Sequence, residues 1–227
     1  MKQLPFLLFL ALLACRQGAA QQSYRAGILP QINLTADGPE NWKFNLRAES
    51  RQIFSEGRFD EAAGGAYRYE RTDFAAVLLR KTGVGSTAGA GYLLRLEDGQ
   101  VIHRLIQQYS VVSGSGALRS GHRFAADQTF RPNEPPEYRL RYRFSVEIPL
   151  QGQNVDPGEL YAKLNNEYLG ILQDAAFDLE TRAVGVLGIN FNDRNKLELG
   201  LDYRANEFLD GPARHQFWFY WGWFVGV

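Results

Sequence analysis

The chain has 227 residues, of which 45% are hydrophobic, 13% aromatic and 22% charged, which is too apolar and too aromatic for an intrinsically disordered protein. Its 25 basic and 25 acidic residues cancel, so no bulk charge favours a nucleic-acid partner. A single cysteine excludes a disulfide framework and a cysteine-ligated zinc site.

The N-terminus carries the only long apolar run, residues 1–14 (MKQLPFLLFLALLA). A lysine precedes its core of about ten residues, which is too short to cross a bilayer as a helix. Small residues follow at positions 18–20, so we expect residues 1–20 to be a secretory signal peptide that is cleaved before Gln21. The alternative is a lipoprotein signal, because the residues before Cys15 also fit a loose lipobox.

Beyond the signal, apolar and polar residues alternate with a period of two. This period gathers the polar residues on one face of a strand, whereas a helix would scatter them around its axis. The alternation is strictest in residues 43–51, 138–148 and 196–205. In chain order the predicted strands are residues 31–36, 43–51, 67–81, 91–96, 101–112, 118–131, 138–148, 160–172, 182–192, 196–205 and 214–225.

Turn-forming residues separate these segments at short spacing, for example Asp98-Gly99 and Asp156-Pro157-Gly158. No amphipathic helix is evident between the strands, which disfavours a parallel α/β sheet. Within residues 67–81 the alternation breaks near Arg80, which predicts a bulge or a charge at a membrane boundary.

The predicted strands fit either a soluble β-sandwich or a membrane β-barrel, since both architectures show alternation. Segments such as 138–148 and 160–172 exceed the usual ~5–6 residues and reach the ~9–11 that cross a bilayer. Aromatic residues gather near segment ends, most densely at 217–224 (FWFYWGWF). We therefore predict that residues 21–227 form one all-β domain, an antiparallel up-and-down transmembrane β-barrel of about 10–12 strands.

Short stretches along nearly the whole mature chain resemble the family of bacterial proteins called domain of unknown function 2490. They are 42–51 (WKFNLRAESR), 74–85 (FAAVLLRKTGVG), 91–94 (GYLL), 103–108 (HRLIQQ), 123–130 (RFAADQTF), 139–150 (RLRYRFSVEIPL), 166–168 (NEY) and 197–203 (LELGLDY). The chain departs from the family by a brief connection at residues 86–90, where a longer hairpin loop is expected. The resemblance implies an outer-membrane barrel and no assigned activity.

Two features of the sequence could suggest an enzyme. Residues 83–88 fit a loose dinucleotide fingerprint, but a strand rather than a helix follows them, so we expect a hairpin and no cofactor. A lipid-acting hydrolase would pair a serine with a histidine on the outer wall. The candidates are His103, His122, His215, Ser110, Ser120 and Ser145, but none lies in a recognisable motif. We therefore expect no catalytic residues, and no metal site, because no two histidines share a strand face at ligand spacing.

The charged faces of the strands hold the candidate functional residues. Arg139, Arg141 and Arg143 form a ladder on one face, where they repel each other unless carboxylates on neighbouring strands compensate them. The predicted lumen charge network comprises Arg47, Glu49, Arg51, Arg139, Arg141, Arg143, Glu147, Glu167, Glu198 and Asp202. It is either a structural network that fills a narrow lumen or a cationic constriction that selects anionic solutes.

The sequence thus favours a non-catalytic outer-membrane protein that is a narrow small-solute channel or a structural component of the envelope. Its expected partners are outer-membrane lipid and the barrel-assembly machinery, with no nucleic acid. The alternatives are an outer-membrane lipid-acting hydrolase and a soluble periplasmic β-sandwich that binds a ligand. In a barrel, apolar residues such as Phe44, Leu140 and Leu201 should face outward.

Overall fold

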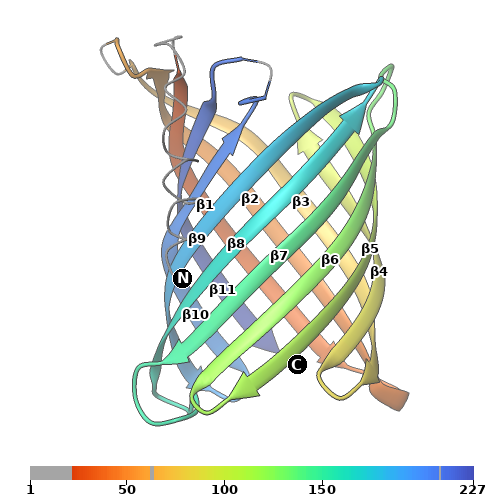
Figure 1. Cartoon of the computed structure of the whole chain (residues 1–227), viewed down its shortest axis with the longest axis vertical. Coiled ribbons are helices and arrows are strands. Elements are labelled where there is room, and N and C mark those ends of the chain that lie inside the picture. The colour runs from red at the N-terminus through yellow and green to blue at the C-terminus, as the bar shows by residue number, and fades with distance from the viewer. Residues whose placement is uncertain (1–21, 62–63, 210) are drawn as a thin grey trace, which may run out of the picture.

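The computed structural model describes residues 22–61, 64–209 and 211–227, which form a closed barrel (Figure 1). The signal peptide predicted for residues 1–20, with Cys15, lies outside the described residues. Within the described ranges, no helix is long and apolar enough to cross a membrane. The strands are β1 (Ser23–Asp37), β2 (Trp42–Arg58), β3 (Gly64–Gly83), β4 (Ser86–Glu97), β5 (Gln100–Ser115), β6 (Leu118–Phe130), β7 (Glu137–Pro149), β8 (Leu160–Gln173), β9 (Ala176–Asn192), β10 (Asn195–Asn206) and β11 (Arg214–Gly226).

Each strand pairs with its neighbours in the chain, and β1 pairs with β11 to close the barrel. All sequential pairs are antiparallel, but β1 and β11 run parallel from the pair Ser23–Arg214 to the pair Thr35–Gly226. Eleven is an odd number, so an up-and-down chain brings its last strand back in the direction of its first. The all-β barrel of about 10–12 strands is therefore confirmed, with one correction, a parallel seam in an otherwise antiparallel sheet.

The predicted strand segments each lie within one strand to within a residue, and most of the strands extend further. Residues 86–90, expected to be a connection, instead begin β4, and the turn is shorter. Gly85 lies in that turn with a φ of 72°, and a Cβ there would come within 2.3 Å of the Val112 carbonyl oxygen. A glycine is therefore required for so tight a connection.

The irregularity predicted near Arg80 lies slightly later in β3. The register between β3 and β4 shifts between Lys81 and Gly83. Arg80 itself remains in the ladder, and its guanidinium carbon lies 5.4 Å from the centre of the Trp42 ring, a cation–π contact.

The barrel is apolar outside and charged inside, the reverse of a soluble sandwich. Leu140 and Leu201 are 72% and 66% exposed, and Phe44 is also exposed. The interior holds a small apolar cluster formed by Leu29, Ile53, Val186, Trp218 and Tyr220. The sandwich alternative is therefore wrong as an architecture, because one sheet closes on itself and turns its apolar face outward.

Candidate functional site

The lumen of the barrel encloses a cavity of about 720 Å³ that is lined mainly by polar side chains. Fifteen basic and eleven acidic side chains line it. Of the predicted lumen charge network, Arg47, Glu49, Arg51, Arg139, Arg141, Arg143, Glu167, Glu198 and Asp202 lie on this cavity. Glu147 does not, and it instead lies 3.8 Å from Arg119.

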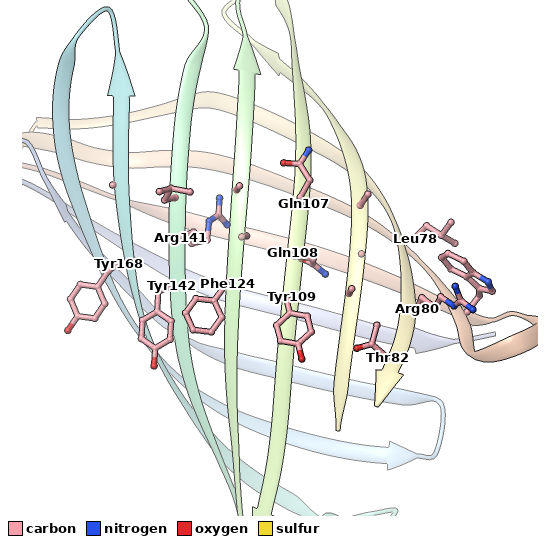
Figure 2. Close-up of a pocket in the computed structure, with 18 residues that line it drawn as sticks. Leu78, Arg80, Thr82, Gln107, Gln108, Tyr109, Phe124, Arg141, Tyr142 and Tyr168 are labelled. Atoms are coloured by element: carbon pink, nitrogen blue, oxygen red, sulfur yellow. The ribbon is translucent and has the colours of Figure 1, made fainter. Parts of the chain in front are cut away.

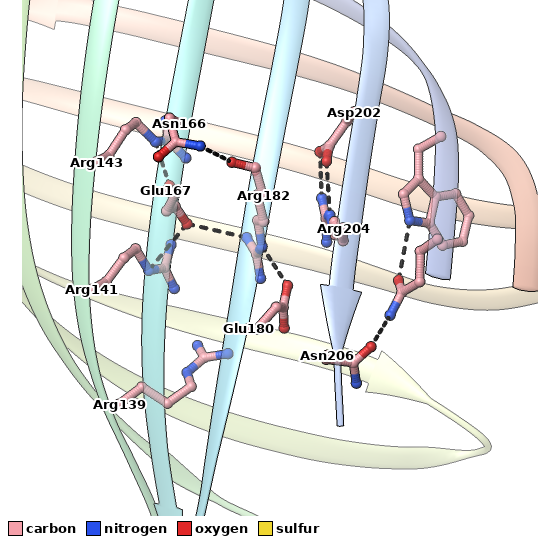
Figure 3. Close-up of polar contacts among 12 residues, drawn as sticks. Arg139, Arg141, Arg143, Asn166, Glu167, Glu180, Arg182, Asp202, Arg204 and Asn206 are labelled. Carbon is pink, nitrogen blue, oxygen red and sulfur yellow. Dashed lines mark hydrogen bonds and ion pairs between the residues drawn. The ribbon is translucent and has the colours of Figure 1, made fainter. Parts of the chain in front are cut away.

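Glu167 on β8 is the most heavily compensated carboxylate of the lumen (Figure 3). Its side chain is only 2% exposed, and Arg143 donates a hydrogen bond to Oε2. Arg182 lies 3.3 Å from Oε1 and Arg141 3.6 Å from it, while Arg123 lies 3.7 Å from Oε2. Four arginines from β6, β7 and β9 thus share one buried negative charge.

Asp127 on β6 compensates the other part of the arginine ladder. Its Oδ2 accepts hydrogen bonds from Arg139 at 2.9 Å and from Arg141 at 2.6 Å. Arg141 therefore lies between Asp127 and Glu167 and contacts both carboxylates. Carboxylates on the two strands adjacent to β7 thus compensate the three like charges of the ladder, which would otherwise repel each other.

Two further pairs are bidentate, the geometry that gives an arginine–carboxylate contact its strength and direction. Arg95 donates from Nε and Nη2 to the two Asp73 oxygens at 2.7 and 2.8 Å. Arg204 makes the same fork with Asp202 at 3.0 and 2.6 Å. All four side chains are buried; Arg95 and Asp73 join β4 to β3, whereas Arg204 and Asp202 lie on the same strand, β10.

Glu198 on β10 receives its partners from β8, two strands away. The Tyr161 hydroxyl donates to Oε1 at 2.8 Å, and Lys163 contacts the same oxygen. The Tyr161 ring lies across Gly188, where a Cβ would come within 2.2 Å of the ring. The glycine thus makes the space through which the tyrosine reaches Glu198.

Arg51 joins the charged and apolar parts of the lumen. Its Nη2 lies 3.0 Å from the Glu49 carboxylate, and its guanidinium carbon lies 5.5 Å from the centre of the Trp218 ring. Trp218 is fully buried in the interior cluster. A desolvated cation over an indole face is stabilised by the ring quadrupole.

Arg104 on β5 differs from the other buried arginines. It is 4% exposed, and its Nε donates to the Thr129 hydroxyl at 2.8 Å. Its Nη2 is buried without a hydrogen-bond partner in the structure. Across the described ranges of the chain, no carboxylate lies within 4.0 Å of it.

Several lumen residues were missed by the sequence pattern, among them Asp73, Arg95, Arg104 and Arg182. They lie on strands whose inward face mixes charged with apolar residues. On β5, for example, the inward positions flanking Arg104 are isoleucines, so the polarity does not alternate there. These residues could have been found by position rather than by polarity, because every second residue of a strand points to the same side of the wall.

The three histidines lie on the outer wall, and each pairs with a tyrosine of the neighbouring strand. These pairs are His103–Tyr92, His122–Tyr142 at 2.9 Å and His215–Tyr203 at 2.9 Å, each through the histidine Nδ1. In the part of the chain that the structure describes, none of the three rings hydrogen-bonds a serine. Among the residues that the structure describes, no group of three or more histidine, cysteine, aspartate or glutamate side chains could hold a metal ion.

The outer wall has a hollow of about 990 Å³ over β2 to β8 (Figure 2). Its lining includes small side chains such as Ala90 and Ala126. Figure 2 shows aromatic rings along one side of it, from Tyr109, Phe124, Tyr142 and Tyr168. The outer wall is not wholly apolar here, because the exposed Gln107 and the half-buried Gln128 hydrogen-bond each other's amides at 3.2 and 3.0 Å.

One comparison with known proteins finds a relationship. The family model described as "Protein of unknown function (DUF2490)" matches residues 27–215. The match begins in β1 and ends at the start of β11, so it includes the strands that build the charged lumen. No curated protein and no solved structure matches the chain.

Proposed function

The chain belongs to the DUF2490 family, and from the geometry of its barrel we propose that it is an outer-membrane protein whose narrow lumen passes small solutes. The observation that supports this most is the division of the wall into an apolar outer face and a charged inner one. In water, so large an exposed apolar surface would cause aggregation, whereas lipid solvates it. Insertion by the barrel-assembly machinery and contact with outer-membrane lipid belong to the same proposal.

The row of Tyr109, Phe124, Tyr142 and Tyr168 also supports a place in a membrane (Figure 2). Rings with an apolar body and a polar tip favour the level of the lipid headgroups. Three of these four residues carry a hydroxyl, and they come from successive strands, β5 to β8.

The lumen supports a narrow passage rather than a wide pore. Eleven strands enclose less space than the ~16–18 strands of general porins. Part of that space is filled by the cluster around Trp218 and part by ion pairs between strands. The remaining cavity of about 720 Å³ suits hydrated ions and small polar solutes.

A structural role in the envelope is the second candidate, favoured by the density of contacts inside the lumen. If buried ion pairs and the Trp218 cluster obstruct the whole cross-section, the barrel does not conduct. The hydrolase alternative gains no support from the histidines, since their Nδ1 atoms bond tyrosine hydroxyls.

Planar-bilayer recording of the refolded protein separates these candidates. We expect small, discrete conductance steps from protein whose folding is verified by heat-modifiable gel migration. Folded protein that never conducts would contradict the channel and support the structural role. Recovery of the native protein in the soluble fraction without detergent would contradict the membrane location.

A further inference from the structure

The charge that lines the lumen is unevenly distributed around the wall. Outside residues 100–149, nine basic side chains face nine acidic ones, so that part of the wall is balanced. Strands β5 to β7, with their connections, contribute the whole positive excess. Their lining residues are Arg104, Arg123, Arg131, Arg139, Arg141 and Arg143 against Asp127 and Glu137.

Ion pairs reduce this excess but do not remove it. Glu137 lies 3.0 Å from Arg131 and 3.5 Å from Arg139. Asp127 and, from β8, Glu167 then serve the remaining arginines, which include the ladder at residues 139, 141 and 143. Arg104 is left with a hydroxyl as its partner.

Arg104 is both buried and held in place. The Thr129 hydroxyl fixes its Nε, its Nη2 is buried without a hydrogen-bond partner, and the residue lines the cavity. A buried guanidinium without a counter-charge is costly, and an oxyanion supplies both the charge and the acceptors.

One further N–H group on the same wall is unsatisfied. The Nε of Arg123 is buried and makes no hydrogen bond in the structure, whereas the Nε atoms of Arg139 and Arg141 lie 3.5 Å from Glu137 and 3.6 Å from Glu167. A tetrahedral oxyanion offers several acceptor oxygens and suits arginines that approach from different strands.

We propose that the β5–β7 wall of the lumen binds a phosphate-type oxyanion with Arg104 as its principal donor. The proposal deepens the proposed function, on which it rests for access of solutes to the lumen. It also places anion recognition at a different residue from the arginine ladder, for which the sequence left an anion-selecting constriction as one of two alternatives. The ladder of Arg139, Arg141 and Arg143 is already bonded to carboxylates, whereas Arg104 is free to bind a ligand.

Calorimetric titration of the folded protein in detergent micelles with inorganic phosphate tests the site. Ionic strength is held constant with chloride, so that only specific binding is measured. We expect saturable binding by the wild type and at least tenfold weaker binding by Arg104→Gln. Arg104→Lys keeps the charge but loses the guanidinium fork, and we expect it to bind with intermediate affinity.

Arg71→Gln is the matched control, because it removes the same charge from the balanced part of the wall. Arg71 pairs with Glu97 at 3.3 Å. When Arg71 is replaced, Glu97 still has Arg95 as a partner at 3.6 Å. We expect phosphate affinity within twofold of the wild type. Heat-modifiable migration verifies that each variant is folded.

Two results would overturn the site. One is the absence of saturable phosphate binding by folded wild-type protein. The other is equal weakening by Arg104→Gln and Arg71→Gln, which would indicate a diffuse positive field. Conductance is independent of this titration, so phosphate binding without conductance refutes the channel and keeps the site. Conductance without phosphate binding refutes the site and keeps the channel.

Discussion

Neutralising Glu167 should destabilise the barrel more than neutralising any less buried lumen carboxylate. In Glu167→Gln the side chain keeps its size, but the charge shared by Arg123, Arg141, Arg143 and Arg182 disappears. Removal of one partner from a buried ion pair leaves the other uncompensated and costs about 3–5 kcal/mol. We expect a loss of about that size in the free energy of unfolding.

Urea unfolding of the protein in lipid vesicles, followed by heat-modifiable migration, measures this loss. Glu147→Gln is the control, because Glu147 is 22% exposed and has one arginine partner at 3.8 Å. An exposed pair of this kind contributes about 0–1 kcal/mol. Adding Arg143→Gln to Glu167→Gln should recover part of the loss, since it removes one stranded cation. Equal losses in Glu167→Gln and Glu147→Gln would refute the reasoning.

The same unfolding assay checks substitutions at three further positions, Gly188, Leu201 and Arg141. Gly188→Ala would place a Cβ within 2.2 Å of the Tyr161 ring and should lower the free energy of unfolding by about 1–3 kcal/mol. The control is Gly211→Ala, whose added Cβ would have no atom within 4 Å and which should lower it far less. Leu201→Lys, at a position that is 66% exposed, should cost about 2–4 kcal/mol in a bilayer, and a negligible cost would argue that this wall faces water. Arg141→Leu removes the hydrogen bond of 2.6 Å to Asp127 and should cost about 1–3 kcal/mol. Arg141→Glu should cost more because it adds repulsion, and a smaller loss than that of Arg141→Leu would contradict this.

Where the alternation is strict, it determined both the strand and the side of the wall on which each residue lies. Residues 138–148 and 196–205 show this most clearly, because every second side chain is polar and the side-chain period of a strand is two. Strand length and the aromatic residues near segment ends favoured the barrel over a sandwich. Where an inward face mixes polarities, as around Arg104, alternation no longer identifies the inward residues.

Only the tertiary structure decided which charges meet. Alternation places Glu167 and Glu147 alike on the inner face, yet one is enclosed by four arginines and the other contacts one. Neighbours across strands depend on register and on the stagger with which the sheet closes, and residues such as Arg51 and Trp218 are distant in the chain. The parallel seam has the same origin, because an odd strand count and closure are properties of the whole wall rather than of any segment.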